Sequence, residues 1–211
     1  MPAARKNTNI AKLPKFTFGS LAMLVVCSTV ACGSIVARAD YPLLSHKFSA
    51  DPSGFEFNGR IYLYCSNDTN GGYTMHSITG SSSDDRKKWT DHGEVLQVPR
   101  DVSRATCSWA SSAISNNGTV YLYFANGGSS IGVTTSSVPT GPFKDAKGSS
   151  LINFSTPGAA TANQWSFDPC IFLDGGQPYL YFGGADPANA RVIQPSANLT
   201  SVSGNDFVQL F

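Results

Sequence analysis

Two aspartates, each followed by proline, stand at equivalent places in a repeated stretch of this chain. The repeat is marked by Tyr-Leu-Tyr segments that begin 59 and 58 residues apart, at Tyr62, Tyr121 and Tyr179. The residues eleven positions before these tyrosines are Asp51, Ala110 and Asp168. Taken singly, an Asp-Pro pair is typical of the start of a turn. Taken together, the matched positions favour a shared site, because two opposed carboxylates can supply the acid and the base that cleave a neutral sugar acetal.

The repeat spacing indicates structural units that stack on one another. Each Tyr-Leu-Tyr segment follows a glycine-containing hairpin turn, at 58–59, 117–118 and 175–176. No stretch sustains the apolar period of a helix, so the sequence predicts an all-β fold. In the first unit we expect strands at 55–57, 61–64 and 73–78, a polar loop at 81–88, and a fourth strand from Trp89 or Gly93 to Val98. Four antiparallel strands followed by a restart are typical of a β-propeller blade.

The second and third units repeat this plan. The second begins near Trp109 and has its third strand at 131–135, and the third unit has its third strand at 191–194. In a propeller the first strand of each blade lies nearest the axis. We therefore expect Asp51 and Asp168 to point into a central cavity.

Residues 1–39 are predicted to be a secretory signal peptide. An apolar stretch at 16–36 follows a basic start and precedes a small-residue cleavage site at 37–39. A membrane anchor is the alternative, but Ser, Thr and Gly interrupt the stretch and no stop-transfer pattern follows. The sequence thus predicts an extracellular domain at 40–211 that is free of the membrane after cleavage. Sequons that fit a secreted glycoprotein occur at Asn67, Asn117, Asn153 and Asn198.

The charge of the chain is nearly balanced. It has 15 Lys and Arg against 14 Asp and Glu, for a formal net charge of +1, and no basic run lies outside the leader. Attraction to nucleic acid or to an anionic membrane therefore has no electrostatic support. The composition indicates a neutral partner.

The cysteines predict neither a metal site nor a fixed disulfide. Outside the leader the chain has three of them, Cys65, Cys107 and Cys170. In a secreted chain this odd number allows one disulfide and one free thiol, and the sequence leaves the pairing open. There is no CxxC pair and no Cys/His cluster, so we expect no metal ligand set and no cofactor.

Four motifs, in order, resemble glycoside hydrolase family 43. They are Ala50-Asp51-Pro52-Ser53, 89–93 (Trp-Thr-Asp-His-Gly), 137–143 (Ser-Val-Pro-Thr-Gly-Pro-Phe) and Phe167-Asp168-Pro169. The resemblance implies a five-bladed β-propeller that hydrolyses linkages of arabinose or xylose with inversion, in polysaccharides such as arabinan, arabinoxylan and xylan. It further implies that Asp51 is the general base and that Asp168 tunes the pKa of the acid and orients it. A central calcium ion is compatible with the resemblance but is not indicated by these residues.

The general acid that the resemblance implies is a glutamate at the start of the next blade. The chain has two glutamates, Glu56 and Glu94, and neither occupies a blade start. Five units of this length need roughly 290 residues, whereas 40–211 holds about three units. We therefore expect a C-terminally truncated member of the family with about three blades. Because it lacks the general acid, we expect this chain to be inactive.

Three aromatic residues are candidates for substrate binding. Trp109 lies at the start of the second unit and Trp165 three residues before Asp168, and an indole face suits the C–H side of a sugar ring. Packing between blades is the alternative for both tryptophans. The family resemblance alone implies that Phe48, near Asp51, borders the cavity.

Three function classes stay open at this point. The first is a secreted glycosidase of the family 43 type. The second is a non-catalytic carbohydrate-binding propeller or gene relic, which the missing acid favours. The third is a scaffold for protein partners, which the internal acids and the low charge disfavour.

Overall fold

The computed structural model describes residues 43–68, 75–157, 159, 165–184 and 189–202, together with the backbone of 208–209. The predicted signal peptide lies outside these residues. The described residues all belong to one compact unit of the chain, at 39–211. In this part of the chain every element is a β-strand. None of its segments is a helix long and apolar enough to cross a membrane.

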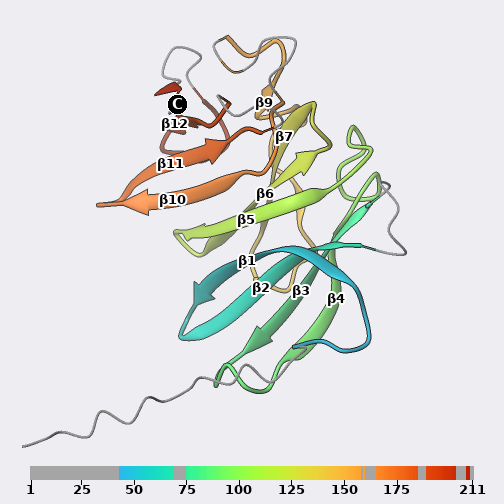
Figure 1. The fold of residues 1–211 in the computed structure, drawn as a ribbon. Coiled ribbons are helices and arrows are strands. Elements are labelled where there is room, and N and C mark those ends of the chain that lie inside the picture. The colour runs from blue at the N-terminus through green and yellow to red at the C-terminus, as the bar shows by residue number, and fades with distance from the viewer. Residues whose placement is uncertain are drawn as a thin grey trace, which may run out of the picture. The chain divides into compact units, whose positions relative to one another are not determined.

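The first sheet is a four-stranded antiparallel meander (Figure 1). Its strands follow one another in the order of the chain: β1 (Ser49–Phe57), β2 (Arg60–Asn67), β3 (Ser77–Ser83) and β4 (Thr90–Gln97). The predicted hairpin joins β1 to β2, with positive φ angles of 52° and 80° at Asn58 and Gly59. Both central residues of a type I′ turn need positive φ, which explains the Asn-Gly pair.

The second and third sheets repeat the meander. The second holds β5 (Trp109–Asn116), β6 (Thr119–Asn126), β7 (Ser130–Ser136), β8 (Lys144–Asp145) and β9 (Ile152–Asn153). The third holds β10 (Cys170–Asp174), β11 (Gln177–Phe182), β12 (Arg191–Ile193) and β13 (Val208–Gln209). The fourth strand of the second sheet is split, because β8 and β9 pair with different halves of β7.

The first strands of the three sheets lie beside one another. β1 and β10 both contact β5, and Figure 1 shows the three strands in the order β1, β5, β10. Two apolar cores lie between neighbouring sheets. One holds side chains of the first and second sheets, such as Tyr64, Ile78 and Leu122, and the other holds side chains of the second and third, such as Tyr123 and Leu180. The strand order therefore brings the start of each sheet to one region of the molecule.

The second tyrosine of the repeat ties the first sheet to the second and the second sheet to the third. The Tyr64 hydroxyl donates a hydrogen bond to the carbonyl oxygen of Pro139 at 2.8 Å, and the Tyr123 hydroxyl donates to that of Leu199 at 2.7 Å. Both tyrosines are fully buried, and burial raises the pKa of each phenol, so each stays a protonated donor. The same repeat position thus makes the same contact in two successive pairs of sheets.

The expected third strand and polar loop of the first unit need correction. The third strand is β3, which continues through Ser83 where we expected a loop, and residues 73–74 of the expected strand lie outside the described part. The serines of β3 are buried, which a polar run does not predict. Their hydroxyls find partners inside the sheet: Ser82 Oγ accepts a hydrogen bond from Arg60 Nε at 2.9 Å and lies 2.7 Å from His92 Nε2.

Candidate active site

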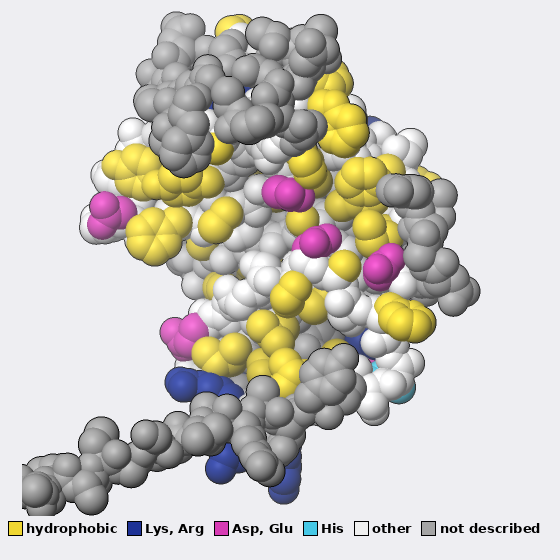
Figure 2. Space-filling model, in the orientation of Figure 1, with side chains coloured by type: hydrophobic (Ala, Val, Ile, Leu, Met, Phe, Trp, Pro, Cys, Tyr) yellow, Lys and Arg dark blue, Asp and Glu magenta, His cyan; other side chains and the backbone are white. Residues whose placement is uncertain are grey.

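A hollow of about 560 Å³ lies where the first strands of the three sheets meet. Its wall is made by three matching runs, 51–54, 110–113 and 168–172. The structure therefore brings Asp51 and Asp168 to one cavity, with Ala110 at the intermediate repeat position. Figure 2 shows acidic side chains in the middle of the visible face, at the level of β1, β5 and β10 in Figure 1, whereas Lys and Arg gather near its lower edge.

The two aspartates share an unusual backbone conformation. Asp51 and Asp168 each have a φ of 50°, in the left-handed region that residues other than glycine rarely adopt. Asp51 lies in an irregularity of β1, where the register shifts between Ala50 and Ser53, and β5 shifts at the matching place, between Trp109 and Ser111. Such bulges re-aim a side chain away from the strand alternation. The sequence locates the carboxylates, and this local backbone turns them toward the hollow.

Ser66 contacts Asp51 directly. The Ser66 hydroxyl donates a hydrogen bond to Asp51 Oδ2 at 3.2 Å and accepts one from the backbone N–H of Ala110 at 2.9 Å. Sequence reasoning missed this serine. The available signal was its position at the end of the second strand, which an antiparallel hairpin places opposite the start of the first.

The environment of Asp168 shifts the pKa of its carboxyl group upward. Partial burial raises the pKa of this carboxyl group, and the negative charge of Asp51 raises it further. The charge effect means that the two carboxylates are electrostatically coupled across the hollow.

The predicted substrate-binding aromatics do not form the wall of this hollow. Trp109 is half-buried beside Gly127, and its indole N–H lacks a hydrogen-bond partner. Trp165 is 45% exposed and packs edge-to-face on Phe167, with ring centroids 5.7 Å apart. Their contacts with substrate stay predictions.

Phe48 and an unpredicted phenylalanine take different places. Phe48 is 69% exposed and borders a separate hollow of about 480 Å³, which shares Pro52 with the first. The aromatic residue in the wall of the first hollow is Phe172, which is 55% exposed. It could have been found from the repeat, because Phe172 pairs with Tyr179 as Phe55 pairs with Tyr62.

The three cysteines of the described part are all free. The disulfide that their odd number allowed is therefore not formed. Cys65 is buried in β2, and burial raises the pKa of its thiol, whereas Cys170 is exposed in the wall of the hollow beside Asp168. Among the residues that the structure describes, no three His, Cys, Asp or Glu side chains lie together as a metal site would require.

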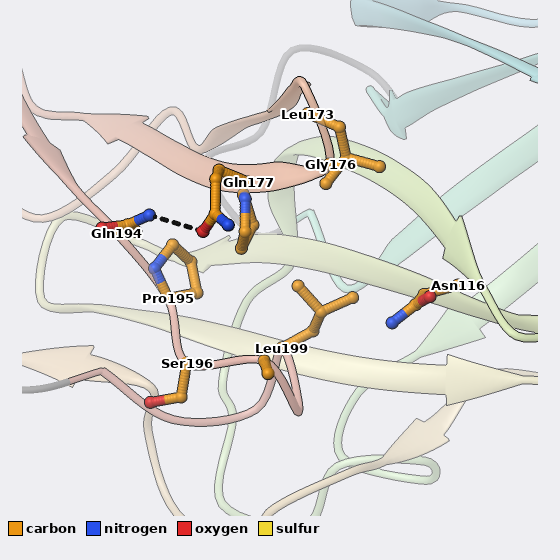
Figure 3. Close-up of a pocket in the computed structure, with 10 residues that line it drawn as sticks. Asn116, Leu173, Gly176, Gln177, Gln194, Pro195, Ser196 and Leu199 are labelled. Atoms are coloured by element: carbon orange, nitrogen blue, oxygen red, sulfur yellow. Dashed lines mark hydrogen bonds between the residues drawn. The ribbon is translucent and has the colours of Figure 1, made fainter.

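A further hollow of about 510 Å³ lies near the hairpin end of β10 and β11 (Figure 3). Gln194 Nε2 donates a hydrogen bond to Gln177 Oε1 at 2.9 Å in its wall, and Asn116 adds a third amide. No titratable side chain lines it. Acid–base chemistry therefore belongs to the hollow that holds the two aspartates.

Known proteins resemble the chain in sequence. The model of the family described as glycosyl hydrolases family 43 matches residues 25–210. An arabinoxylan arabinofuranohydrolase of Paenibacillus polymyxa is 36% identical over 199 residues, which cover 78% of this chain and 31% of that protein. A protein of the same name from Bacillus subtilis is 36% identical over 201 residues, covering 78% and 39%. The chain thus spans about a third of the length of these relatives.

Solved structures agree with the sequence matches. An α-L-arabinofuranosidase from Clostridium thermocellum aligns with a TM-score of 0.70 and 43% identity, covering 81% of this chain and 59% of that one. A family 43 arabinoxylan arabinofuranohydrolase from Bacillus subtilis, solved with cellotetraose, aligns with a TM-score of 0.69 and 34% identity, covering 80% and 42%. These neighbours confirm the expected fold, because they are five-bladed propellers and the three sheets correspond to part of one. The chain belongs to glycosyl hydrolase family 43.

Proposed function

We propose that this chain carries the general base of a secreted glycosidase. The enzyme removes α-L-arabinofuranosyl or β-D-xylosyl units from arabinan, arabinoxylan or xylan with inversion. The observation that carries the proposal is the meeting of Asp51 and Asp168 on one hollow. The names of the two arabinoxylan arabinofuranohydrolases support this substrate class. The predicted leader at 1–39 supports secretion.

Asp51 is the general base in this proposal. Its carboxylate removes a proton from the water that attacks the anomeric carbon, on the side opposite the leaving oxygen. An inverting enzyme keeps about 6.5 to 9.5 Å between base and acid so that this water fits. Asp168 orients the acid and raises its pKa through negative charge.

Neither glutamate of the chain is placed to be the acid. Glu56 accepts a hydrogen bond from the Gly59 backbone N–H at 2.6 Å in the first hairpin, and Glu94 accepts one from Ser77 Oγ at 2.7 Å on β4. Neither lines the hollow. We therefore propose that neither glutamate protonates a poor leaving group at this hollow.

The choice of leaving group tests this division of roles. The 2,4-dinitrophenolate group of an aryl glycoside departs without being protonated. The chain should therefore hydrolyse dinitrophenyl arabinofuranoside or xyloside while leaving arabinoxylan oligosaccharides intact. General acid catalysis is worth about 10²- to 10⁴-fold, which sets the expected gap between the two substrates. Asp51→Asn should abolish the dinitrophenyl activity while the thermal unfolding curve stays cooperative. Retention of most of the turnover in Asp51→Asn would refute the base assignment.

The placement of Glu56 and Glu94 away from the hollow favours a second candidate, a propeller that binds oligosaccharides without cleaving them or that is a gene relic. Calorimetry with arabino- and xylo-oligosaccharides separates these. Binding with no dinitrophenyl release supports a binding module, and neither binding nor release supports a relic.

A further inference from the structure

Ser66 lies on β2 opposite the start of β1, where it pairs with Ala50, and it is fully buried. A serine hydroxyl has one proton to donate and two lone pairs that accept. Because the Ala110 N–H occupies a lone pair at 2.9 Å, the proton is free to point at Asp51 Oδ2, 3.2 Å away. One buried hydroxyl thus serves a backbone donor and a carboxylate at the same time.

The two partners of Ser66 lie at the two bulges that face the hollow. Ala110 lies within the register shift of β5, and Asp51 within that of β1. A bulge leaves a residue of its strand unpaired in the ladder, so its N–H needs another acceptor. Ser66 supplies that acceptor and thereby joins the bulge of the second sheet to the carboxylate of the first.

A second serine makes the same link between sheets without a carboxylate. Ser112 Oγ on β5 accepts a hydrogen bond from the Ile171 N–H on β10 at 3.1 Å, and Ser112 is also buried. The structure gives Ser112 no aspartate partner among the described residues. A comparison of Ser66 with Ser112 therefore separates the bond between sheets from the bond to the carboxylate.

We propose that Ser66 is a positioning residue that holds the Asp51 carboxylate in its orientation toward the hollow and couples that orientation to the packing of the second sheet. This inference deepens the proposed function, because it rests on Asp51 as the base. The left-handed backbone at Asp51 sets the direction in which its side chain leaves the strand, and the hydroxyl of Ser66 selects among the rotamers that remain. Without the hydroxyl, the carboxylate rotates among several orientations.

Asp168 provides a readout that needs no catalysis. The charge of Asp51 contributes to the raised pKa of Asp168, so the pKa of Asp168 reports where that charge lies. The titratable side chains in the wall of the hollow are Asp51, Asp168 and Cys170. Removing the charge with Asp51→Asn should lower the pKa of Asp168.

The test is a double-mutant cycle on the full chain, followed by ¹³C NMR titration of the Asp168 carboxyl group. The drop in the Asp168 pKa caused by Asp51→Asn is measured in the wild type, in Ser66→Ala and in Ser112→Ala. We expect the drop to shrink by at least half in Ser66→Ala and to keep its full size in Ser112→Ala. Ser66→Thr, which keeps a hydroxyl, should restore it.

The outcomes are distinct. If Asp51→Asn lowers the Asp168 pKa in Ser66→Ala by as much as in the wild type, the proposal is overturned. If Ser112→Ala reduces this decrease in the Asp168 pKa as much as Ser66→Ala does, the effect belongs to sheet packing and the proposal is overturned as well. If Asp51→Asn keeps its activity on dinitrophenyl glycosides, the base assignment fails while this cycle still measures the positioning. On that substrate Ser66→Ala should lower kcat more than it changes KM.

Discussion

The third sheet carries large apolar side chains at the same repeat positions as the first two sheets, but in different surroundings. Tyr64 and Tyr123 are fully buried against the following sheet, whereas Tyr181, at the same place in the third repeat, is 39% exposed. Phe55 and Ile114 are each 8% exposed, whereas their equivalent Phe172 is 55% exposed. The repeat therefore encodes a surface that suits a following sheet, and its burial depends on whether such a sheet is packed there.

The two contacts between sheets also differ from each other. Ion pairs join the connection before β5 to the second sheet, where Asp101 pairs with Lys144 and Arg104 with Asp145. In the described part of the chain, no ion pair joins the second sheet to the third. The first contact thus combines an apolar core with buried charge, whereas the second combines its core with uncharged hydrogen bonds, such as those of the Tyr123 and Ser112 hydroxyls.

Truncating the tyrosines should give the largest difference. Tyr64→Ala and Tyr123→Ala each remove a fully buried ring, which should lower the free energy of unfolding by about 3 to 5 kcal/mol. Tyr181→Ala should cost less than about 1 kcal/mol, because its ring is partly in solvent. Urea unfolding followed by tryptophan fluorescence measures the three values. Equal losses at all three positions would show that the third face is covered in solution.

Neutralising Asp101 should weaken the first contact by an intermediate amount. Its side chain is buried and accepts hydrogen bonds from Arg100, Lys144 and the Gln97 N–H. Asp101→Asn removes the charge from these bonds, which should cost about 1.5 to 3 kcal/mol at pH 7. The matched control, Asp84→Asn, affects an exposed ion pair with Arg60 and should cost less than about 1 kcal/mol.

The contribution of Asp101 should depend on pH. Burial alone raises its pKa, but the hydrogen bonds from Arg100, Lys144 and the Gln97 N–H lower it from 3.8 to about 2. Because the folded pKa lies below the unfolded one, the stabilisation is present above about pH 4 and is lost as the pH falls toward 2. The stability difference between wild type and Asp101→Asn should therefore shrink over that range in urea titrations. A constant difference would exclude Asp101 as its source.

Removing only the tyrosine hydroxyls should give the smallest difference. Tyr64→Phe leaves the Pro139 carbonyl without its donor, and Tyr123→Phe does the same to Leu199, so each should cost about 0.5 to 1.5 kcal/mol. Tyr181→Phe should be neutral within about 0.5 kcal/mol. Thermal unfolding of the three variants orders them, and a loss at Tyr181 equal to the others would contradict the comparison.

Much of the fold could be predicted from local sequence. The hairpin turns, the strands at 61–64 and 131–135 and the paired aspartates follow from turn chemistry and from the repeat. β3 could not be predicted in full, because its serines have low strand propensity and are buried only through partners on neighbouring strands. The substrate role of the tryptophans and the roles of the two aspartates stay predictions.

The amino-acid sequence by itself determined the repeat, the all-β class and the residue types that reach the candidate site, because these depend on spacing and on local backbone preference. Only the tertiary structure decided which carboxylate meets which hydroxyl. Ser66, Asp51 and Ala110 come from three strands of two sheets. They meet because the packing of the two sheets brings both bulges to the wall of one hollow. Packing between sheets likewise decided that Tyr64 is buried and Tyr181 is not, since identical local sequence meets a neighbour in one place and solvent in the other.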